Sequence, residues 1–349
     1  MRAAILRGDR DIGLGEIADP EIRPGEVLLR TQHAGICGTD LHIFRGEFHD
    51  RVQYPAILGH ELGGVIAELG RDVSGWSVGE RVAVDPIIPC HGCPACLEGH
   101  INACRTLKLL GVDIAGGYGE YVAVPQQNLY RLPDKVRMEH APMVEMYGLG
   151  HHILGRGRVQ PGERVAIIGT GKLGLAVLDV LCHTASATET IVIDVAPVRL
   201  EIARRLGAQH LCNALEGDPV LEVMEATEGA GVDCVIECVG HHHEVPGRDA
   251  PLSQAVRMIR SGGRIVTAGL GAAPTTVPFK ELVLKEAQIV ASRVTAGEFP
   301  RAIRMMAKGL LHPELLVTHQ SSLRDVSEAF ARVDAESPEI IKTVLVLAD

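Results

Sequence analysis

Residues that bind metals are concentrated in two short stretches near the N-terminus. HAGICGTDLH, residues 33–42, contains Cys37, and LGHELGG, residues 58–64, contains His60 and Glu61. Zinc accepts a thiolate, an imidazole and a carboxylate, and three protein ligands leave its fourth position open to a substrate. Because adjacent residues seldom reach one ion, we favour Glu145, in PMVEMYGLGHH, over Glu61 as the third ligand. We expect Glu61 to approach the metal transiently or to support the ligands.

Three other side chains of the first stretch suit the chemistry of an open zinc site. Such a site lowers the pKa of a bound alcohol, and the released proton must leave the pocket. Thr39 offers a hydroxyl and His42 an imidazole, with a cofactor ribose hydroxyl as a bridge between them. Asp40 is placed to hold the far nitrogen of His60 and fix its tautomer. Taken singly, a cysteine here could be a buried thiol and a histidine a surface or core residue. The prediction of a metal site therefore depends on the whole set of residues.

A loop at residues 90–105, CHGCPACLEGHINACR, contains four cysteines in the pattern C-x2-C-x2-C-x7-C. Four thiolates at these spacings close a tetrahedral zinc site without an open position. A closed site cannot activate a substrate, so we expect the metal to stabilise the loop. Unrelated thiols and an iron–sulfur cluster are the alternatives. The predicted ligands are Cys90, Cys93, Cys96 and Cys104.

The segment RVAIIGTGKLG, residues 164–174, fits the G-x-G-x-x-G turn that binds dinucleotides. The turn follows an apolar strand and opens a helix, whose N-terminal N–H groups attract phosphates. An acidic residue, Asp194, ends the next apolar run and is expected to accept hydrogen bonds from the ribose, which favours NAD over NADP. A solvated strand end is the alternative for Asp194. The residues expected to contact the cofactor here and at the later VTAGL segment are Gly169, Gly171, Lys172, Leu173, Gly174, Asp194, Arg199 and Gly269.

The elements that carry these residues fall into two groups. Short Val- and Ile-rich runs bounded by glycine or proline, at 26–36, 63–70, 79–86 and 119–125, predict a mainly β domain. From about residue 149, apolar strands alternate with helical segments, which predicts a doubly wound parallel sheet. We expect the first domain to span 1–148 and 294–349, with the tail returning to it, and the nucleotide-binding domain to span 149–293.

Composition narrows the classes of partner. The 349 residues carry a net charge of −10, which disfavours nucleic acid and anionic membranes as partners. The N-terminus shows no apolar run of the kind found in signal peptides, and no stretch is long enough to span a membrane. With nine cysteines and no export signal, we expect ligands and buried thiols in a reducing cytoplasm rather than disulfides.

These motifs together resemble the zinc-dependent medium-chain alcohol dehydrogenase family. The resemblance is carried by GICGTDLH, LGHELGGVIAELG, the four-cysteine loop, IGTGKLG and the terminal IIKTVLV. It implies a GroES-like catalytic domain built from both ends of the chain, a Rossmann domain between, and a dimer or tetramer. It also implies that Cys37, His60 and Glu145 are catalytic zinc ligands beside Glu61. Thr39 and His42 would form the proton relay, and Lys342 would contact the cofactor pyrophosphate.

The branch within the family is indicated by several departures from the ethanol-type pattern. Glu145 replaces a cysteine ligand, as in polyol and threonine dehydrogenases, although Met146 stands where that branch has proline. Arg293, in SRVTAGEF, resembles an arginine near the substrate of polyol dehydrogenases. The tryptophan segment of threonine dehydrogenases is replaced by FRGEFHD. A polyol or sugar-like secondary alcohol is therefore favoured.

The predicted function is oxidation of a secondary alcohol to a ketone with hydride transfer to NAD, using two zinc ions per chain. L-threonine 3-dehydrogenase activity, a non-catalytic NADH-sensing zinc protein and a zinc-free quinone reductase are the alternatives. The GHHHEVPGRDAP segment, with His241, His242 and His243, is interpreted as a solvated insertion rather than a third metal site. His151 and His152 have either a pocket or a structural role.

Overall fold

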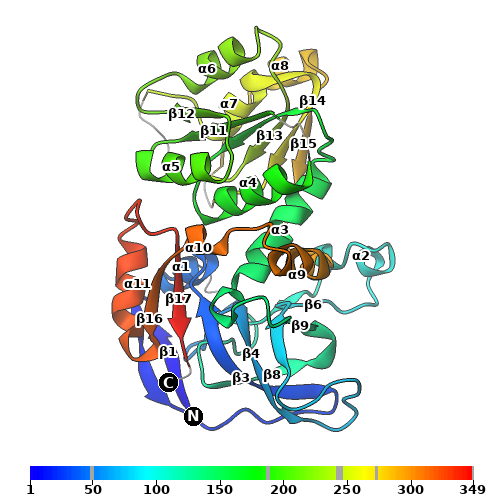
Figure 1. Ribbon diagram of the computed structural model, residues 1–349, viewed down its shortest axis with the longest axis vertical. Coiled ribbons are helices and arrows are strands. Elements are labelled where there is room, and N and C mark those ends of the chain that lie inside the picture. The colour runs from blue at the N-terminus through cyan, green and yellow to red at the C-terminus, as the bar shows by residue number, and fades with distance from the viewer. Residues whose placement is uncertain (48–50, 186–188, 241–246, 272–273, 348–349) are drawn as a thin grey trace. The chain divides into compact units, whose positions relative to one another are not determined.

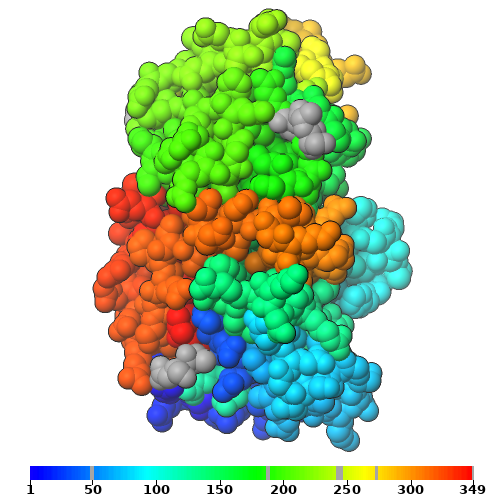
Figure 2. Space-filling model, in the orientation of Figure 1, coloured from blue at the N-terminus to red at the C-terminus, as the bar shows by residue number. Residues whose placement is uncertain are grey.

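The computed structural model describes residues 1–47, 51–185, 189–240, 247–271 and 274–347. The chain forms two compact units, one made of Met1–Gly148 with Thr295–Asp349 and the other of Leu149–Val294. Figure 2 shows the C-terminal segments, in orange and red, on the same body as the blue and cyan N-terminal segments. The tail was expected to return to the first domain, and one of its strands pairs with a strand of the N-terminal part of the chain, as described below. His241, His242 and His243 lie outside the described residues.

The unit of residues 1–148 and 295–349, called the catalytic unit below because it carries the predicted zinc ligands, is built on a seven-stranded sheet. The strand order is β16-β17-β3-β4-β5-β9, with β8 also paired to β3 (Figure 1). Two small two-stranded sheets, β1-β2 and β6-β7, accompany it. Its strands are β1 (Arg2–Gly8), β2 (Asp11–Glu16), β3 (Glu26–Gly35), β4 (Glu61–Leu69), β5 (Arg81–Val84), β6 (Ile87–Ile88), β7 (Lys108–Leu109), β8 (Tyr121–Pro125), β9 (Leu129–Arg131), β16 (Val317–Ser322) and β17 (Lys342–Val346). Its helices are α1 (Gly38–Phe44), α2 (Pro94–Leu97), α9 (Phe299–Ala307), α10 (Pro313–Leu316) and α11 (Val326–Asp334).

Strand β3 is the centre of this sheet and leads directly into the candidate site. Val27, Leu29 and Thr31 alternate inward along it and are fully buried, as the two-residue period of a half-buried strand requires. Its first half pairs with β8 and its second half with β17, whereas β4 lies along the other edge. The antiparallel register sets Val344 opposite Gly35, so the end of the chain is brought beside the end of β3.

An aromatic cluster fixes helix α1 against the rest of the catalytic unit. The ring of Phe44, at the end of α1, lies 5.2 Å from that of Phe330 on α11, and Tyr118 lies 6.0 Å from Phe330 in an edge-to-face arrangement. Such pairs add to the stabilisation that apolar burial provides. The buried face of α1 thus holds its half-buried face, which carries Thr39 and His42, in a fixed position.

The nucleotide-binding unit is a parallel six-stranded sheet in the order β12-β11-β10-β13-β14-β15. Helices α4 and α5 cover one face and α6, α7 and α8 the other (Figure 1). Its strands are β10 (Arg164–Ile168), β11 (Glu189–Asp194), β12 (His210–Asn213), β13 (Val232–Glu237), β14 (Ile259–Thr267) and β15 (Gln288–Ala291). Its helices are α4 (Lys172–Thr184), α5 (Pro197–Arg205), α6 (Pro219–Ala226), α7 (Pro251–Met258) and α8 (Phe279–Leu284), and α3 (Met143–Arg156) continues from the catalytic unit into it.

This strand order is that of a doubly wound dinucleotide-binding fold, with the change of direction between β10 and β13. The central strand β10 is buried from Val165 to Ile168, because helices cover both faces of the sheet. The predicted fold class, a mainly β domain combined with a doubly wound parallel sheet, is confirmed. No helix among the described residues is both long and apolar enough to cross a bilayer.

Candidate functional site

Cys37, His60 and Glu61 form one group in the catalytic unit, with ligand atoms all within 4.8 Å of one another. Cys37 is the N-cap of α1, and the other two residues lead into β4. His60 and Glu61 are buried, whereas Cys37 is half-buried. The donor set is one that zinc accepts, and with three protein ligands one coordination position stays available.

A left-handed turn at Gly59 precedes the adjacent residues His60 and Glu61. Gly59 has φ +97°, a left-handed conformation that favours glycine, and a Cβ there would lie 2.5 Å from the ring of Tyr118. The sharp turn places both His60 and Glu61 at the end of β4. Gly59 is thus required at this position both by its backbone conformation and by the close approach of Tyr118.

Glu145 lies in the first turn of α3 and is buried, but it is not a member of this group. Burial, together with the nearby negative charge of Glu61, raises the pKa of Glu145 to about 7. The preference for Glu145 over Glu61 as third ligand is therefore not supported by the arrangement of the described residues, which favours Glu61. A role for Glu145 as a ligand stays a prediction.

Asp40 organises the group from within α1. Its carboxylate accepts hydrogen bonds from the Cys37 N–H at 2.7 Å and the Tyr118 hydroxyl at 2.9 Å, and Oδ1 lies 3.6 Å from Nδ1 of His60. Burial acts to raise the pKa of Asp40, but His60 and these hydrogen bonds outweigh it and lower the pKa. The 3.6 Å separation is an ion-pair distance rather than a hydrogen bond, and Nδ1 is the ring nitrogen of His60 that faces Asp40.

Lys342 forms an ion pair with Glu61, and both side chains are fully buried. Its ammonium group also donates to the Ile36 carbonyl at 3.1 Å. The pairing of β17 with β3 brings the two charges together, and Gly35 makes room for them, since a Cβ there would lie 2.4 Å from the Glu61 carboxylate. In this structure Lys342 thus compensates the negative charge of Glu61. The expected contact of Lys342 with a cofactor pyrophosphate stays a prediction.

Thr39 and His42 lie one turn apart on α1, which places them on the same face of the helix. Both are half-buried, whereas Asp40, Leu41 and Ile43 point into the core. The Nδ1 atom of His42 lies 2.5 Å from a carboxylate oxygen of Glu47. The residues predicted for the relay therefore lie on the accessible face of the helix whose N-cap is Cys37.

The four predicted structural ligands also come together. The sulfur atoms of Cys90, Cys93, Cys96 and Cys104 all lie within 4.8 Å of one another, with Cys93 and Cys96 3.5 Å apart. A zinc–sulfur bond of 2.3 Å implies sulfur atoms about 3.8 Å apart in a tetrahedron. The cluster therefore fits a closed zinc site. His91 and His100 are exposed, as a solvated role requires.

The glycine turn in the nucleotide-binding unit has the geometry that a dinucleotide requires. Gly169 has φ +93°, and a Cβ on Gly174 would lie 1.8 Å from the Gly169 carbonyl oxygen. A Cβ on Gly171 would meet nothing within 4 Å, so the space before the N-terminus of α4 is open to a phosphate. Lys172 and Leu173, the first residues of α4, border this space and are half-buried.

Asp194 is buried at the end of β11, and backbone N–H groups occupy most of the hydrogen-bond acceptor positions of its carboxylate. Oδ1 accepts from Val195 at 2.8 Å and Ala196 at 2.9 Å, and Oδ2 accepts from Thr170 at 2.5 Å. A carboxylate has about four acceptor positions, so about one remains for a ribose hydroxyl. Arg199 is half-buried on α5 nearby. The contacts of both residues with a cofactor stay predictions.

Comparison with known proteins decides the family. The family pattern "Alcohol dehydrogenase GroES-like domain" matches residues 23–134, and "Zinc-binding dehydrogenase" matches residues 173–308. The sorbitol dehydrogenase of Bacillus subtilis is 34% identical, with 99% of this chain and 97% of that protein covered. An L-threonine 3-dehydrogenase of Pyrococcus horikoshii is 33% identical, with 88% and 87% covered. The chain belongs to the zinc-dependent medium-chain alcohol dehydrogenases.

A solved structure supports the same assignment for the whole dehydrogenase. The crystal structure of the E. coli CFT073 short chain alcohol dehydrogenase rspB, complexed with NADH, has a TM-score of 0.91 and 33% identity, and 99% of each chain is covered. The predicted family, its polyol and threonine branch, and the assignment as an oxidoreductase are confirmed.

Two predicted residues of this dehydrogenase lie on loops of the nucleotide-binding unit. Gly269 follows β14, and a Cβ there would lie 2.1 Å from the Gly240 nitrogen, so the two loops require this close approach. Arg293 follows β15 and is exposed.

His151 is buried in α3 and His152 is half-buried. Sequence reasoning did not single out Gly35, Tyr118 or Glu47.

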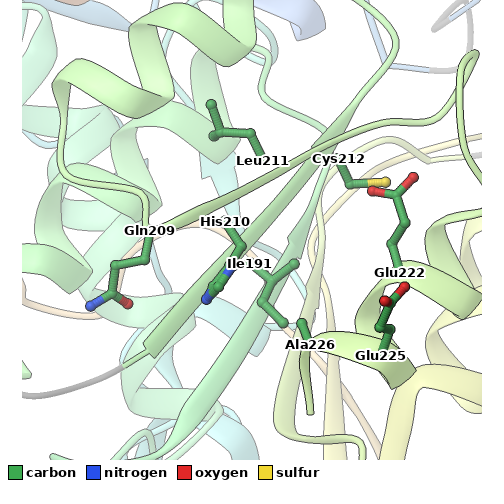
Figure 3. A pocket seen from close by; sticks show the side chains of 8 residues that line it. All are labelled: Ile191, Gln209, His210, Leu211, Cys212, Glu222, Glu225 and Ala226. Atoms are coloured by element: carbon green, nitrogen blue, oxygen red, sulfur yellow. The ribbon is translucent and has the colours of Figure 1, made fainter. Parts of the chain in front are cut away.

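A pocket of about 400 Å³ lies elsewhere in the nucleotide-binding unit, beside β12 and α6 (Figure 3). The Cys212 sulfur and the Glu222 carboxylate point toward each other in it, and burial with this neighbour raises the pKa of the thiol. The thiol is therefore not activated, and no predicted site residue lines the pocket. Its lining residues are Ile191, Gln209, His210, Leu211, Cys212, Glu222, Glu225 and Ala226.

Proposed function

We propose that this dehydrogenase oxidises a secondary alcohol of a polyol or sugar-like compound to the ketone, with NAD as hydride acceptor. The observation that carries the proposal is the convergence of Cys37, His60 and Glu61 at the N-terminus of the helix that presents Thr39 and His42. The sorbitol dehydrogenase relative and the NADH complex of rspB support the substrate class and the cofactor.

The residues fit the groups that the family implies. Cys37, His60 and Glu61 would hold the catalytic zinc, and the four cysteines of residues 90–104 would hold a second, structural zinc. When bound, the catalytic ion polarises the alcohol oxygen and lowers the pKa of the hydroxyl. The glycine turn would hold the NAD pyrophosphate at the N-terminus of α4, and NAD supplies the hydride-accepting ring.

The protein's own side chains carry the proton and fix the geometry. The Thr39 hydroxyl accepts the proton released from the alcohol while it donates its own, and His42 delivers a proton to solvent. Asp40 faces the Nδ1 atom of His60 at an ion-pair distance, and Lys342 compensates the charge of the buried Glu61 carboxylate. We also propose a cytoplasmic location and assembly into a homo-oligomer, on the basis of the sequence and family.

The test is a substrate screen with a matched variant. Purified protein is incubated with NAD and with polyols, L-threonine or simple secondary alcohols, and NADH formation is followed. We expect turnover with a polyol or sugar-like alcohol, and loss of that turnover in Cys37→Ser with NADH binding retained. Cys234→Ser, a buried thiol of the nucleotide-binding unit, is the control. Full activity of Cys37→Ser would contradict the site, and exclusive turnover of L-threonine would contradict the substrate class.

A further inference from the structure

The C-terminal end of helix α1 has a backbone arrangement that brings Glu47 back over the helix. Gly46 has φ +83°, its N–H donates to the Ile43 carbonyl at 2.9 Å, and the Glu47 N–H donates to the His42 carbonyl at 2.9 Å. These two bonds define a Schellman motif, in which the second residue beyond the helix folds back on the third residue from its end. The motif therefore fixes Glu47 beside His42 through backbone bonds alone.

The side chains at these two positions make an unusual pair for this motif. An apolar contact commonly joins them, but here a carboxylate oxygen of Glu47 lies 2.5 Å from Nδ1 of His42. The side chains are 37% and 21% exposed, so the pair is in contact with water while the imidazole is partly covered. A carboxylate at one ring nitrogen fixes the histidine tautomer and compensates the charge of the imidazolium form.

The other charged groups around this helix end have partners of their own. Arg45 donates to Asp334 of α11 and to Glu336 just beyond it, both at 2.6 Å. Asp334 also pairs with Arg10. Asp9 faces Gly46 and accepts a hydrogen bond from Tyr54 at 2.8 Å. Among the described acids at this helix end, Glu47 is therefore the one that forms an ion pair with the His42 ring.

We propose that Glu47 is a positioning residue for His42 in the proton path. Its carboxylate accepts the Nδ1 proton, so Nε2 is the nitrogen that takes up the proton from the Thr39 side. The imidazolium that forms keeps its ion pair with Glu47 and then releases one proton to water, which restores the neutral ring. This inference rests on the proposed function, in which His42 carries the proton out.

The first test measures the histidine tautomer without turnover. Nitrogen-15 shifts of the His42 ring, assigned with His42→Gln, are recorded in wild type, Glu47→Ala and Glu47→Gln. We expect the neutral ring to carry its proton on Nδ1 in the wild type and to shift toward the Nε2 form in Glu47→Ala. Glu189→Gln, which removes the carboxylate of a second His–Glu pair, His210–Glu189 at 3.1 Å, is the control and should leave the His42 shifts unchanged.

The second test is the pH profile of alcohol oxidation. Removing the partner carboxylate should displace the rising limb of the kcat profile toward lower pH, with a roughly threefold effect on kcat along that limb. High salt should produce the same displacement in wild type but not in Glu47→Gln, because the exposed charge is screened. Gly46→Ala disrupts the turn at φ +83° and leaves the Glu47 carboxylate in place. It should displace the pH profile of kcat in the same direction as Glu47→Ala does.

The outcomes separate this inference from the proposed function. If Glu47→Ala leaves both the tautomer and the pH profile as in wild type, while Thr39→Ala and His42→Gln impair turnover, Glu47 has no positioning role and the relay stands. If Thr39→Ala and His42→Gln retain full turnover, the relay itself is wrong. A uniform loss of kcat at every pH with an unchanged tautomer would show a structural role only and would overturn the inference.

Discussion

Replacing Lys342 with methionine removes the cation that compensates the buried carboxylate of Glu61. Both side chains are fully buried, and the ammonium also donates to the Ile36 carbonyl. Removing one partner of a buried ion pair costs about 3–5 kcal/mol, because the remaining charge stays in a medium of low dielectric constant. Replacing both charges, in a Glu61→Gln and Lys342→Met double variant, should recover much of that loss.

The sequence offers a selective assay for this unit. The chain has a single tryptophan, Trp76, which lies in the catalytic unit with Arg131 4.2 Å above its ring. Urea unfolding followed by tryptophan fluorescence therefore reports on this unit. With a slope of about 2–3 kcal/mol per molar urea, the Lys342→Met midpoint should fall by roughly 1–2.5 M. The loss should be larger in a Cys37→Ser background, where no metal ion shares the charge of Glu61.

A surface pair provides the matched control. Arg332 and Glu328, 2.7 Å apart on α11, are 61% and 65% exposed. Arg332→Met should therefore change the free energy of unfolding by less than about 0.5 kcal/mol. A loss below about 1 kcal/mol in Lys342→Met, or an additive double variant, would refute the reasoning that these two charges stabilise each other in the interior.

Three further predictions concern other parts of the chain. Gly174→Ala should weaken NADH binding at least about tenfold in a fluorescence titration, because its Cβ would lie 1.8 Å from the Gly169 oxygen; unchanged affinity would contradict this. Lys285→Met should lower the unfolding free energy of the nucleotide-binding unit by about 1–3 kcal/mol in calorimetry, since its ammonium donates to three carbonyls at the end of α7. Burial raises the pKa of Asp85 to about 6, so the fold loses stability as the pH rises from about 4, where the unfolded chain ionises, to about 6. Asp85→Asn should therefore be more stable by about 2–3 kcal/mol at pH 8, and tryptophan-monitored unfolding should show no gain below about pH 4.

The sequence predicted correctly those features that depend on residues close together in the chain, such as the glycine turn and the cysteine loop. The roles of Gly169 and Gly174 follow from backbone conformation and close packing within a single turn, and spacing is enough to infer them. The four cysteines of residues 90–104 lie in one loop, so the chain between them has no room to separate the thiols widely. Alternating apolar segments likewise indicated both sheets.

Features that depend on distant pairing could not be read from the sequence. Lys342 meets Glu61 because β17 pairs with β3 in one particular register, and nothing local to either residue specifies that register. Asp194 was predicted to serve a ribose, but its carboxylate mainly accepts backbone hydrogen bonds from the glycine turn and the residues that follow β11. The third ligand is also not decided by local sequence: Glu61 lies with Cys37 and His60 in this structure, and the preference for Glu145 stays a prediction.

The central claim is that Cys37, His60 and Glu61 hold one zinc ion while the cysteine loop holds another. X-ray absorption at the zinc edge, combined with metal analysis, tests it most directly. Wild type should show two zinc ions per chain with an average of about 2.5 sulfur ligands each, because one ion binds four thiolates and the other binds one. Cys37→Ser should retain a single zinc with four sulfur ligands. Two zinc ions with an unchanged sulfur count in Cys37→Ser would contradict the account.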